Sequence, residues 1–284
     1  IAICAKRRGA SAETMSSTQT FVRVQFDYEQ AASDQLSFRT GDIIELAVDL
    51  ECCTNWQLGT NLRSHDVGLI PPSEDGYVRV EKITVPYVQP VILLGSMKNQ
   101  VQDYLIETLP DKFTTSVPHT TRKPRENEIN GVDYFFVRES TMRTMLRNGL
   151  FVDCGEYEGN LYGTTEAAVR IVAQRYRKHC ILDSCTSIVR LGRSKIYPII
   201  LYVGAITFHN LMNMQSDGCI SKYEARDAIN ADEEILTKWS RVFNGVIRES
   251  NLADLYRRVI ETIERLDCDS PWVPIDSFFF EKFS

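Results

Sequence analysis

The chain lacks an apolar run long enough to cross a lipid bilayer, and it lacks a cysteine pattern that would hold a metal. A membrane-spanning helix needs about 18 to 20 apolar residues, and the best candidate, residues 197–206, is roughly half that length and better suited to a buried strand. None of the eight cysteines forms a Cys-x-x-Cys pair or has a histidine at zinc-ligand spacing. We therefore expect small buried cysteines in a reducing environment, and no metal site.

A basic excess is also missing. The 38 acidic residues outnumber the 32 basic ones, which gives a net charge of -6. This balance argues against a general nucleic-acid binder, so we expect no nucleic acid partner. Hydrophobic residues at 43% and charged residues at 25% are ordinary for a globular protein, and 284 residues are enough for two modest domains.

The first part of the chain is predicted to hold a small all-β domain. Residues 1–20 contain a stretch rich in Ser, Thr and Ala without an apolar period, and we interpret them as a linker. Residues 21–86 carry short apolar runs broken by turn residues. The strands are expected at residues 21–26, 42–48, 56–60, 67–71 and 77–85.

Residues 88–269 are predicted to form an α/β domain. Apolar strands at 91–95, 180–182 and 197–203 alternate with amphipathic helices. The helices are expected from the spacing of Val101, Leu105 and Leu109, and over residues 165–176, 222–243 and 252–266. Such alternation is typical of a parallel sheet covered on both faces. A tail at 277–284 follows, and its Phe278–Phe280 run could pack on the β domain or contact another chain.

The β domain resembles a Src-homology-3 (SH3) domain. The motifs, in family order, are FDY at 26–28, LSF at 36–38 with Gly41-Asp42, Trp56, and GLIP at 68–71. The resemblance implies an aromatic shelf for proline-rich peptides. However, the family's tyrosine after GLIP is absent and Phe26 replaces a shelf tyrosine. Two readings stay open: peptide binding, or aromatic residues Phe26, Tyr28 and Trp56 that mainly hold the domain together.

Residues 90–268 resemble guanylate kinase. The motifs are SVPHTTRKPR at 116–125, EINGVDYFFV at 128–137, LYGT at 161–164 and CILD at 180–183. Together with the SH3-like domain, they identify the chain as similar to membrane-associated guanylate kinases of the Discs-large group. This resemblance implies a P-loop-kinase-like fold. It also implies a split SH3-like barrel whose closing strand returns at 271–276, so that the two domains contact each other within the chain.

The family's phosphate-donor loop is degenerate here. A working loop reads GxxxxGK[ST], in which backbone amides wrap the phosphates and the lysine and hydroxyl serve the transferring group and magnesium. The matching stretch contains Gly95, Ser96, Met97 and Lys98, with one glycine and no GK[ST] ending. We therefore expect no catalytic residue, no cofactor and no phosphoryl transfer.

The family's acceptor-phosphate site is kept. The positions that bind the phosphate of GMP in the enzymes correspond here to Arg122, Arg125, Tyr134 and Tyr162. Arginine suits this role because its planar fork pairs with phosphate oxygens in bidentate fashion. The base-reading positions are altered, since the resemblance places Pro118 at a serine position, Asp153 at a glutamate and Cys185 at an aspartate. Thr164 keeps its hydroxyl.

These features lead to a hypothesis in which the site binds phosphoserine or phosphothreonine segments of partner proteins. Arg122, Arg125, Tyr134 and Tyr162 would hold the phosphate, and Asp153, Tyr157 and Thr164 would face neighbouring peptide residues, while Pro118 would stiffen the hinge. The resemblance implies a scaffold of junction, polarity or synaptic complexes at the cytoplasmic face of the plasma membrane, with only indirect membrane association. Two alternatives stay open: an active guanylate kinase, and a purely structural tandem with a vestigial pocket.

Overall fold

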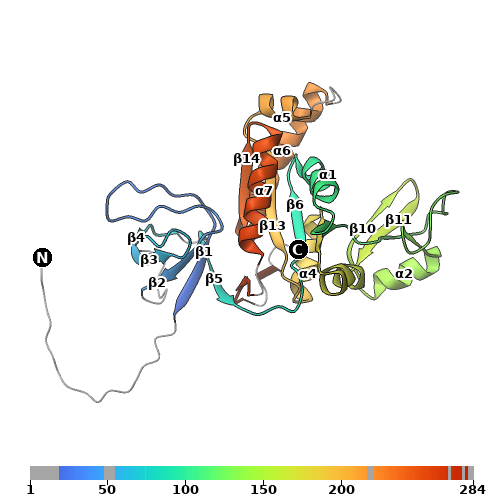
Figure 1. The fold of residues 1–284 in the computed structure, drawn as a ribbon, viewed down its shortest axis with the longest axis horizontal. Helices are drawn as coiled ribbons and strands as arrows, with labels where there is room; N and C mark the ends of the chain where they lie inside the picture. Colours follow the sequence, from blue (N-terminus) through green and yellow to red (C-terminus); the bar gives the residue numbers. More distant parts are fainter. Residues whose placement is uncertain are drawn as a thin grey trace, which may run out of the picture.

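The described residues form three sheets, of six, five and four strands. The computed structural model describes residues 19–47, 55–73, 75–215, 220–267, 270–276 and 279–280. Figure 1 shows the strands of the six-stranded sheet at one end of the molecule, and β10, β11 and α2 at the other, with the five-stranded sheet between them. The predicted linker at 1–20 lies almost entirely outside the described residues, and so does most of the tail.

The six-stranded sheet is antiparallel and is the predicted SH3-like unit. Its strand order is β15-β5-β1-β2-β3-β4. Among the described residues, no pairing is found between the two edge strands β15 and β4. The strands are β1 (Thr20–Val24), β2 (Ile43–Leu46), β3 (Gln57–Asn61), β4 (Val67–Ile70), β5 (Tyr77–Lys82) and β15 (Trp272–Pro274).

The strand β15 confirms the predicted split of this sheet. Trp272 pairs with Lys82, and Pro274 pairs with Val80, in antiparallel register. The backbone N–H of Ile83 donates to the carbonyl of Pro271 at 3.1 Å, which extends the ladder by one bond. A segment from beyond the α/β unit therefore supplies an edge strand to the N-terminal sheet.

The five-stranded sheet is parallel, as the alternation of strands and helices predicts. Its order is β14-β13-β6-β12-β7, and the strands are β6 (Val91–Leu94), β7 (Phe113–Thr114), β12 (His179–Leu182), β13 (Ile199–Ala205) and β14 (Gly245–Glu249). Every residue of β6, β12 and β13 is buried. Such continuous apolar strands are typical of sheets with both faces covered.

Helices cover both faces of this sheet. Val91 and Leu93 face a core with α1 and α7, whereas Ile92 and Leu94 face a core with α3, α4 and the end of α6. The helices are α1 (Lys98–Thr108), α2 (Glu139–Arg147), α3 (Glu166–Arg170) continued by the π-helix η1 (Ile171–Tyr176), α4 (Cys185–Arg193), α5 (Phe208–Met214), α6 (Lys222–Trp239), the 3-10 turn η2 (Ser240–Val242) and α7 (Leu252–Leu266). In the described part of the chain, no helix is both long and apolar enough to span a membrane.

The helix ends differ from the predictions in two places. The helix expected through Leu109 ends at Thr108, and Leu109 caps it. The helix expected over 222–243 ends at Trp239, and the 3-10 turn η2 follows it. Its start is fixed by a capping box, in which the Ser221 side chain accepts from the N–H of Glu224 and the Glu224 side chain accepts from the N–H of Ser221.

The SH3-like sheet and the α/β unit share one hydrophobic core. Val78 and Val80 on β5 belong to the same buried cluster as Ile92, Leu94 and Tyr202 of the parallel sheet. The other face of the SH3-like sheet buries Val22, Val24, Ile44 and Leu46 in a separate small core. The β unit is thus packed on both faces, and one of those faces is completed by the second unit.

The aromatic tail packs into this shared core. Phe279 and Phe280 are buried, and a Cβ added at Gly192 of α4 would meet the Phe280 ring. Phe279 and Phe280 thus pack in the core that the β domain and the α/β unit share, while a contact with another chain stays a prediction. Phe278 lies outside the described residues.

The four-stranded sheet was not predicted. Its order is β10-β11-β8-β9, with β8 (His119–Thr120), β9 (Phe135–Phe136), β10 (Phe151–Tyr157) and β11 (Asn160–Thr165). Strands β8 and β9 have two residues each, which is too short for a period-2 pattern to register.

Candidate functional site

The four-stranded sheet gathers the predicted acceptor-site residues from distant parts of the chain. Arg122 and Arg125 follow the end of β8, and Tyr134 directly precedes β9. Tyr162 lies on β11, where it pairs with Thr120 of β8. The sheet therefore brings together side chains that are up to forty residues apart in sequence.

Arg122 makes contacts through both its side chain and its backbone. Its guanidinium donates to both carboxylate oxygens of Glu128, at 2.9 and 2.7 Å. The Arg122 Cζ lies 5.3 Å from the ring centroid of Tyr134 and 5.8 Å from that of Phe136. Its backbone N–H also donates to the Thr120 hydroxyl at 3.1 Å. These contacts fix the planar Arg122 guanidinium, which donates two hydrogen bonds to the Glu128 carboxylate. Another anion could bind in the place of this carboxylate.

Electrostatics agree with this geometry. The hydrogen bonds that Arg122 donates to the Glu128 carboxylate, and to a lesser degree its hydrogen bond with the Tyr162 hydroxyl, raise the pKa of Arg122. The same pairing with Arg122, together with the backbone N–H of Arg125, lowers the pKa of Glu128 to about 2. Glu128 is therefore ionised at any pH near neutrality.

The Glu128 carboxylate gives a testable pH dependence. Its pKa falls from 4.5 to about 2 on folding, so the stabilisation of the loop is complete above pH 4.5 and is lost as the pH falls toward 2. We expect the carboxyl carbon of Glu128 to titrate near pH 2 by NMR. In an Arg122→Ala variant the titration should return toward pH 4.5, and an unchanged midpoint would contradict the pairing.

Three further residues of the predicted phosphate grip lie around Arg122. The Tyr134 and Tyr162 rings meet edge to face with centroids 6.1 Å apart. Arg125 donates its backbone N–H to Glu128 at 2.7 Å, and its side chain is exposed. Arg125 is thus anchored by its backbone, which leaves its guanidinium available to a ligand.

The residues predicted to face a peptide are spread along the β10–β11 hairpin. Asp153 is paired with Thr164 in this ladder, and its carboxylate accepts from the hydroxyls of Ser184 and Thr186 at 2.9 and 2.8 Å. Tyr157 lies near the tip of the hairpin and is 67% exposed. Pro118 precedes β8, and its carbonyl accepts the N–H of Phe135 at 2.8 Å. Asp153 is therefore tied to the start of α4, while Tyr157 is open to solvent.

The stretch matched to the donor loop, residues 95–98, forms a tight turn between β6 and α1. Met97 is fully buried in the core with Val101 and Leu105, and its N–H donates to the carbonyl of Val203 at 3.3 Å. The Lys98 ammonium donates to the backbone carbonyl and the carboxylate of Asp183, at 3.0 and 3.2 Å. The side chains at positions 97 and 98 are thus engaged by the protein itself.

Gly95 is required by the backbone of this turn. Its φ is +106°, a conformation that L residues rarely adopt, and an added Cβ would fall on the Val203 carbonyl oxygen. We expect Gly95→Ala to lower the free energy of unfolding by about 2 kcal/mol, measured by chemical denaturation. Gly155→Ala is the matched control, because nothing lies within 4 Å of its added Cβ. Equal stability of the two variants would contradict this account.

Comparison with known proteins decides the family. The family profile described as Guanylate kinase matches residues 87–266, and the profile described as SH3 domain matches residues 23–72. The chain belongs to the membrane-associated guanylate kinases. Disks large homolog 4 of Danio rerio is 31% identical over 292 residues, which cover 89% of this chain and 36% of that protein. Disks large 1 tumor suppressor protein of Drosophila melanogaster is 35% identical over 200 residues, covering 70% and 20%, respectively.

One solved structure that matches this chain is the SH3-kinase fragment of tight junction protein 3. It is 16% identical, with a TM-score of 0.43, and the match covers 90% of this chain and 99% of that one. The present chain spans only about a fifth to just over a third of the curated relatives described above.

The SH3-like unit of this family member keeps its aromatic residues packed. Phe26 contacts Phe38 edge to face at 5.3 Å, and Tyr28 lies 6.3 Å from Trp56. The Tyr28 hydroxyl donates to the Gln35 side chain at 2.5 Å. These contacts favour the interpretation that the aromatic residues hold the unit together, although Trp56 remains 43% exposed.

Sequence reasoning missed Glu128 as a site residue. The sequence did contain a signal, since a carboxylate three residues after Arg125, in a loop that carries three basic residues, is a natural partner for a guanidinium. Phe136 was missed as well, although its ring centroid lies 5.8 Å from the Arg122 Cζ and 5.8 Å from the Tyr134 ring. Among the described residues, no cluster of three or more His, Cys, Asp or Glu side chains could hold a metal ion.

Proposed function

We propose that this chain is a scaffold module that binds phosphoserine or phosphothreonine segments of partner proteins at the former GMP-phosphate site, without phosphoryl transfer. The observation that supports this most is the bidentate, aromatic-flanked Arg122 beside Tyr162 and Arg125. Two arginines and two tyrosine hydroxyls match the acceptor oxygens of a phosphate monoester. A phosphate would exchange places with the Glu128 carboxylate on the fork of Arg122.

Loss of catalysis is supported by the donor side. The turn at Gly95 is short, Met97 is buried, and Lys98 is hydrogen-bonded to Asp183. Few groups of this stretch are therefore left to bind the phosphates of a nucleoside triphosphate. Transition-state stabilisation in phosphoryl transfer depends on the loop amides, its lysine and magnesium. A coupled assay with ATP and GMP at high protein concentration should show no turnover, and measurable ADP formation would support the enzyme alternative instead.

The central test is calorimetry with a matched pair of peptides, one carrying a phosphoserine and the other a serine. The phosphorylated peptide is expected to bind and the other to bind at least a hundredfold more weakly, because an unmodified hydroxyl leaves the arginines without a dianion. Equal affinities would overturn the proposal. That result would favour the third reading, a structural tandem with a vestigial pocket.

The Glu128 carboxylate competes with the incoming phosphate. Replacing it by Glu128→Gln keeps an acceptor for the Arg125 N–H but removes the negative charge. We expect roughly five- to tenfold tighter phosphopeptide binding by calorimetry, since one repulsive charge is gone and Arg122 is released. Glu139→Gln, which alters a solvent-exposed carboxylate paired with Arg143 on α2, should change nothing. Weaker binding by Glu128→Gln would show that the carboxylate positions Arg122 instead of competing for it.

The relatives suggest where such a module acts. Proteins named Disks large are its curated relatives, and by this likeness the chain would organise junction, polarity or synaptic complexes as a peripheral component at the cytoplasmic face of the plasma membrane. Partners of the complete protein would bind through phosphorylated segments. The contact between the SH3-like and guanylate-kinase-like units is part of the module itself.

A further inference from the structure

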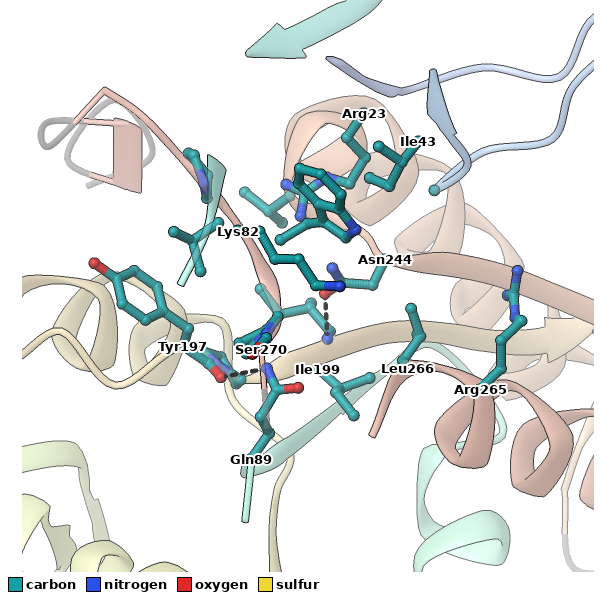
Figure 2. Close-up of a pocket in the computed structure, with 18 of the residues that line it drawn as sticks. Arg23, Ile43, Lys82, Gln89, Tyr197, Ile199, Asn244, Arg265, Leu266 and Ser270 are labelled. Carbon is teal, nitrogen blue, oxygen red and sulfur yellow. Dashed lines mark hydrogen bonds between the residues drawn. The ribbon is translucent and has the colours of Figure 1, made fainter. Parts of the chain in front are cut away.

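A cavity of about 320 Å³ lies between the two units, away from the acceptor site. Its walls come from β1, β2 and β5 of the SH3-like sheet, from the start of β13, and from the segment that carries β15. In Figure 2, Arg23 and Ile43 lie on one side of the cavity, and Gln89 and Ile199 lie on the opposite side. The cavity is thus enclosed by residues from both ends of the chain.

Arg23 is the unusual member of this lining. It lies on the central strand β1, opposite Ile43 and Val78, on the sheet face that packs against the α/β unit. The residue is only 4% exposed, and its Nε has no hydrogen-bond partner. Burial alone lowers the pKa of its guanidinium to about 10, with no carboxylate acting in the opposite direction.

A buried, unpaired charge is costly unless an opposite charge accompanies it. Within the part of the chain that the structure describes, the lining of the cavity contains three cationic side chains, of Arg23, Lys82 and Arg265, and no aspartate or glutamate. Asp42 lies near Arg265 at 3.9 Å, but it also pairs with Arg63 at 2.8 Å, outside this lining. The described residues therefore leave the cavity with an excess of positive charge.

Polar groups beside Arg23 are able to complete an anion site. The side-chain oxygen of Asn244 accepts the N–H of Ile200 at 2.8 Å, which leaves its NH₂ group as a donor. The Lys82 ammonium lies 5.8 Å from the ring centroid of Trp272. Trp272, Leu266 and Phe280 supply an apolar wall.

We propose that this cavity binds a small organic anion, a phosphate monoester or carboxylate with an apolar body, through Arg23 and Asn244. The volume is at the lower end of small-molecule sites, which limits the ligand to about one ring with its charged group. The anion neutralises Arg23, and its body packs against Trp272. Because the site is walled by both units, its occupant stabilises their contact.

The test uses the indole N–H signal of Trp272 as a local reporter. Phenyl phosphate, benzoate and uncharged benzyl alcohol are titrated into the Arg122→Ala, Arg125→Ala double variant, so that the proposed phosphopeptide site contributes nothing. We expect saturable shifts of this signal with the two anions and at least tenfold weaker binding of benzyl alcohol. The tighter of the two anions identifies the preferred head group. Absence of a saturable shift with either anion would overturn the proposal.

Two substitutions in that background locate the binding group. Arg23→Met removes the guanidinium while keeping an unbranched side chain, and it is expected to weaken anion binding at least tenfold without lowering the denaturation midpoint in anion-free buffer. Asn244→Asp keeps the acceptor for the Ile200 N–H and places a negative charge in the cavity, so anion binding should be lost here too. Unchanged anion affinity in both variants would refute the assignment, and Asn244→Asp decides the matter if Arg23→Met fails to fold.

Discussion

Replacing Arg122 with alanine is expected to reduce the affinity for a phosphoserine peptide by roughly a hundredfold. The side chain of Arg122 is 18% exposed, and its fork is held by Glu128 and two aromatic rings. A phosphate that loses this fork keeps only Arg125 and the tyrosine hydroxyls. Calorimetry with the phosphorylated peptide of the matched pair measures the effect.

Two comparisons make this prediction specific. Arg122→Lys keeps the charge but not the planar fork, so its affinity should lie between those of the wild type and the alanine variant. Arg143→Ala removes an arginine of α2 that also pairs with a glutamate but is 61% exposed, and it should bind as the wild type does. If Arg122→Ala binds the phosphopeptide as tightly as the wild type, or if Arg143→Ala loses as much affinity as Arg122→Ala, then Arg122 does not bind the phosphate.

Introducing a charge on the SH3-like sheet at Val80 is expected to destabilise the helices of the other unit. Val80 is 1% exposed and belongs to the core shared with the parallel sheet. We expect Val80→Asp to lower the free energy of unfolding by about 3 kcal/mol or more, because a carboxylate is buried there without a partner. Circular dichroism at the helical minimum follows this change, since the described helices lie outside the SH3-like unit.

Val67→Asp is the matched control for this variant. Val67 lies on the edge strand β4 of the same sheet and is 63% exposed, so the same substitution should change the denaturation midpoint very little. If the two units fold independently, Val80→Asp will not change the denaturation midpoint that circular dichroism at the helical minimum reports. That outcome would contradict the shared core.

The fold was largely predictable because its signals are local. Runs such as Val91–Leu94 and Ile199–Ala205 are apolar throughout, which only a doubly covered strand explains. The spacing of Leu255, Val259 and Ile263 gave α7 directly. Strands β8 and β9 escaped detection because each is two residues long and is fixed by pairing with distant partners.

The candidate site was predictable only in part. Arg122, Arg125, Tyr134 and Tyr162 were named from a family resemblance, and the structure arranges them around one sheet. The pairing of Arg122 with Glu128 required the loop between β8 and β9 to fold back on itself. Asp153 was expected to face a ligand, yet its carboxylate accepts hydrogen bonds from α4, because the β10–β11 ladder places it beside that helix.

The sequence by itself determined strands such as β6 and β13 and helices such as α1 and α7, and it showed that the stretch matched to the donor loop has only one glycine and no GK[ST] ending. These properties follow from side-chain periodicity and from the presence or absence of particular groups. The tertiary structure decided that β5 is the strand that β15 joins, which side chains make up the shared core, and that, among the described residues, no carboxylate lines the cavity around Arg23. These features depend on contacts between residues nearly two hundred positions apart in the sequence. The local pattern of apolar and polar residues does not specify such contacts.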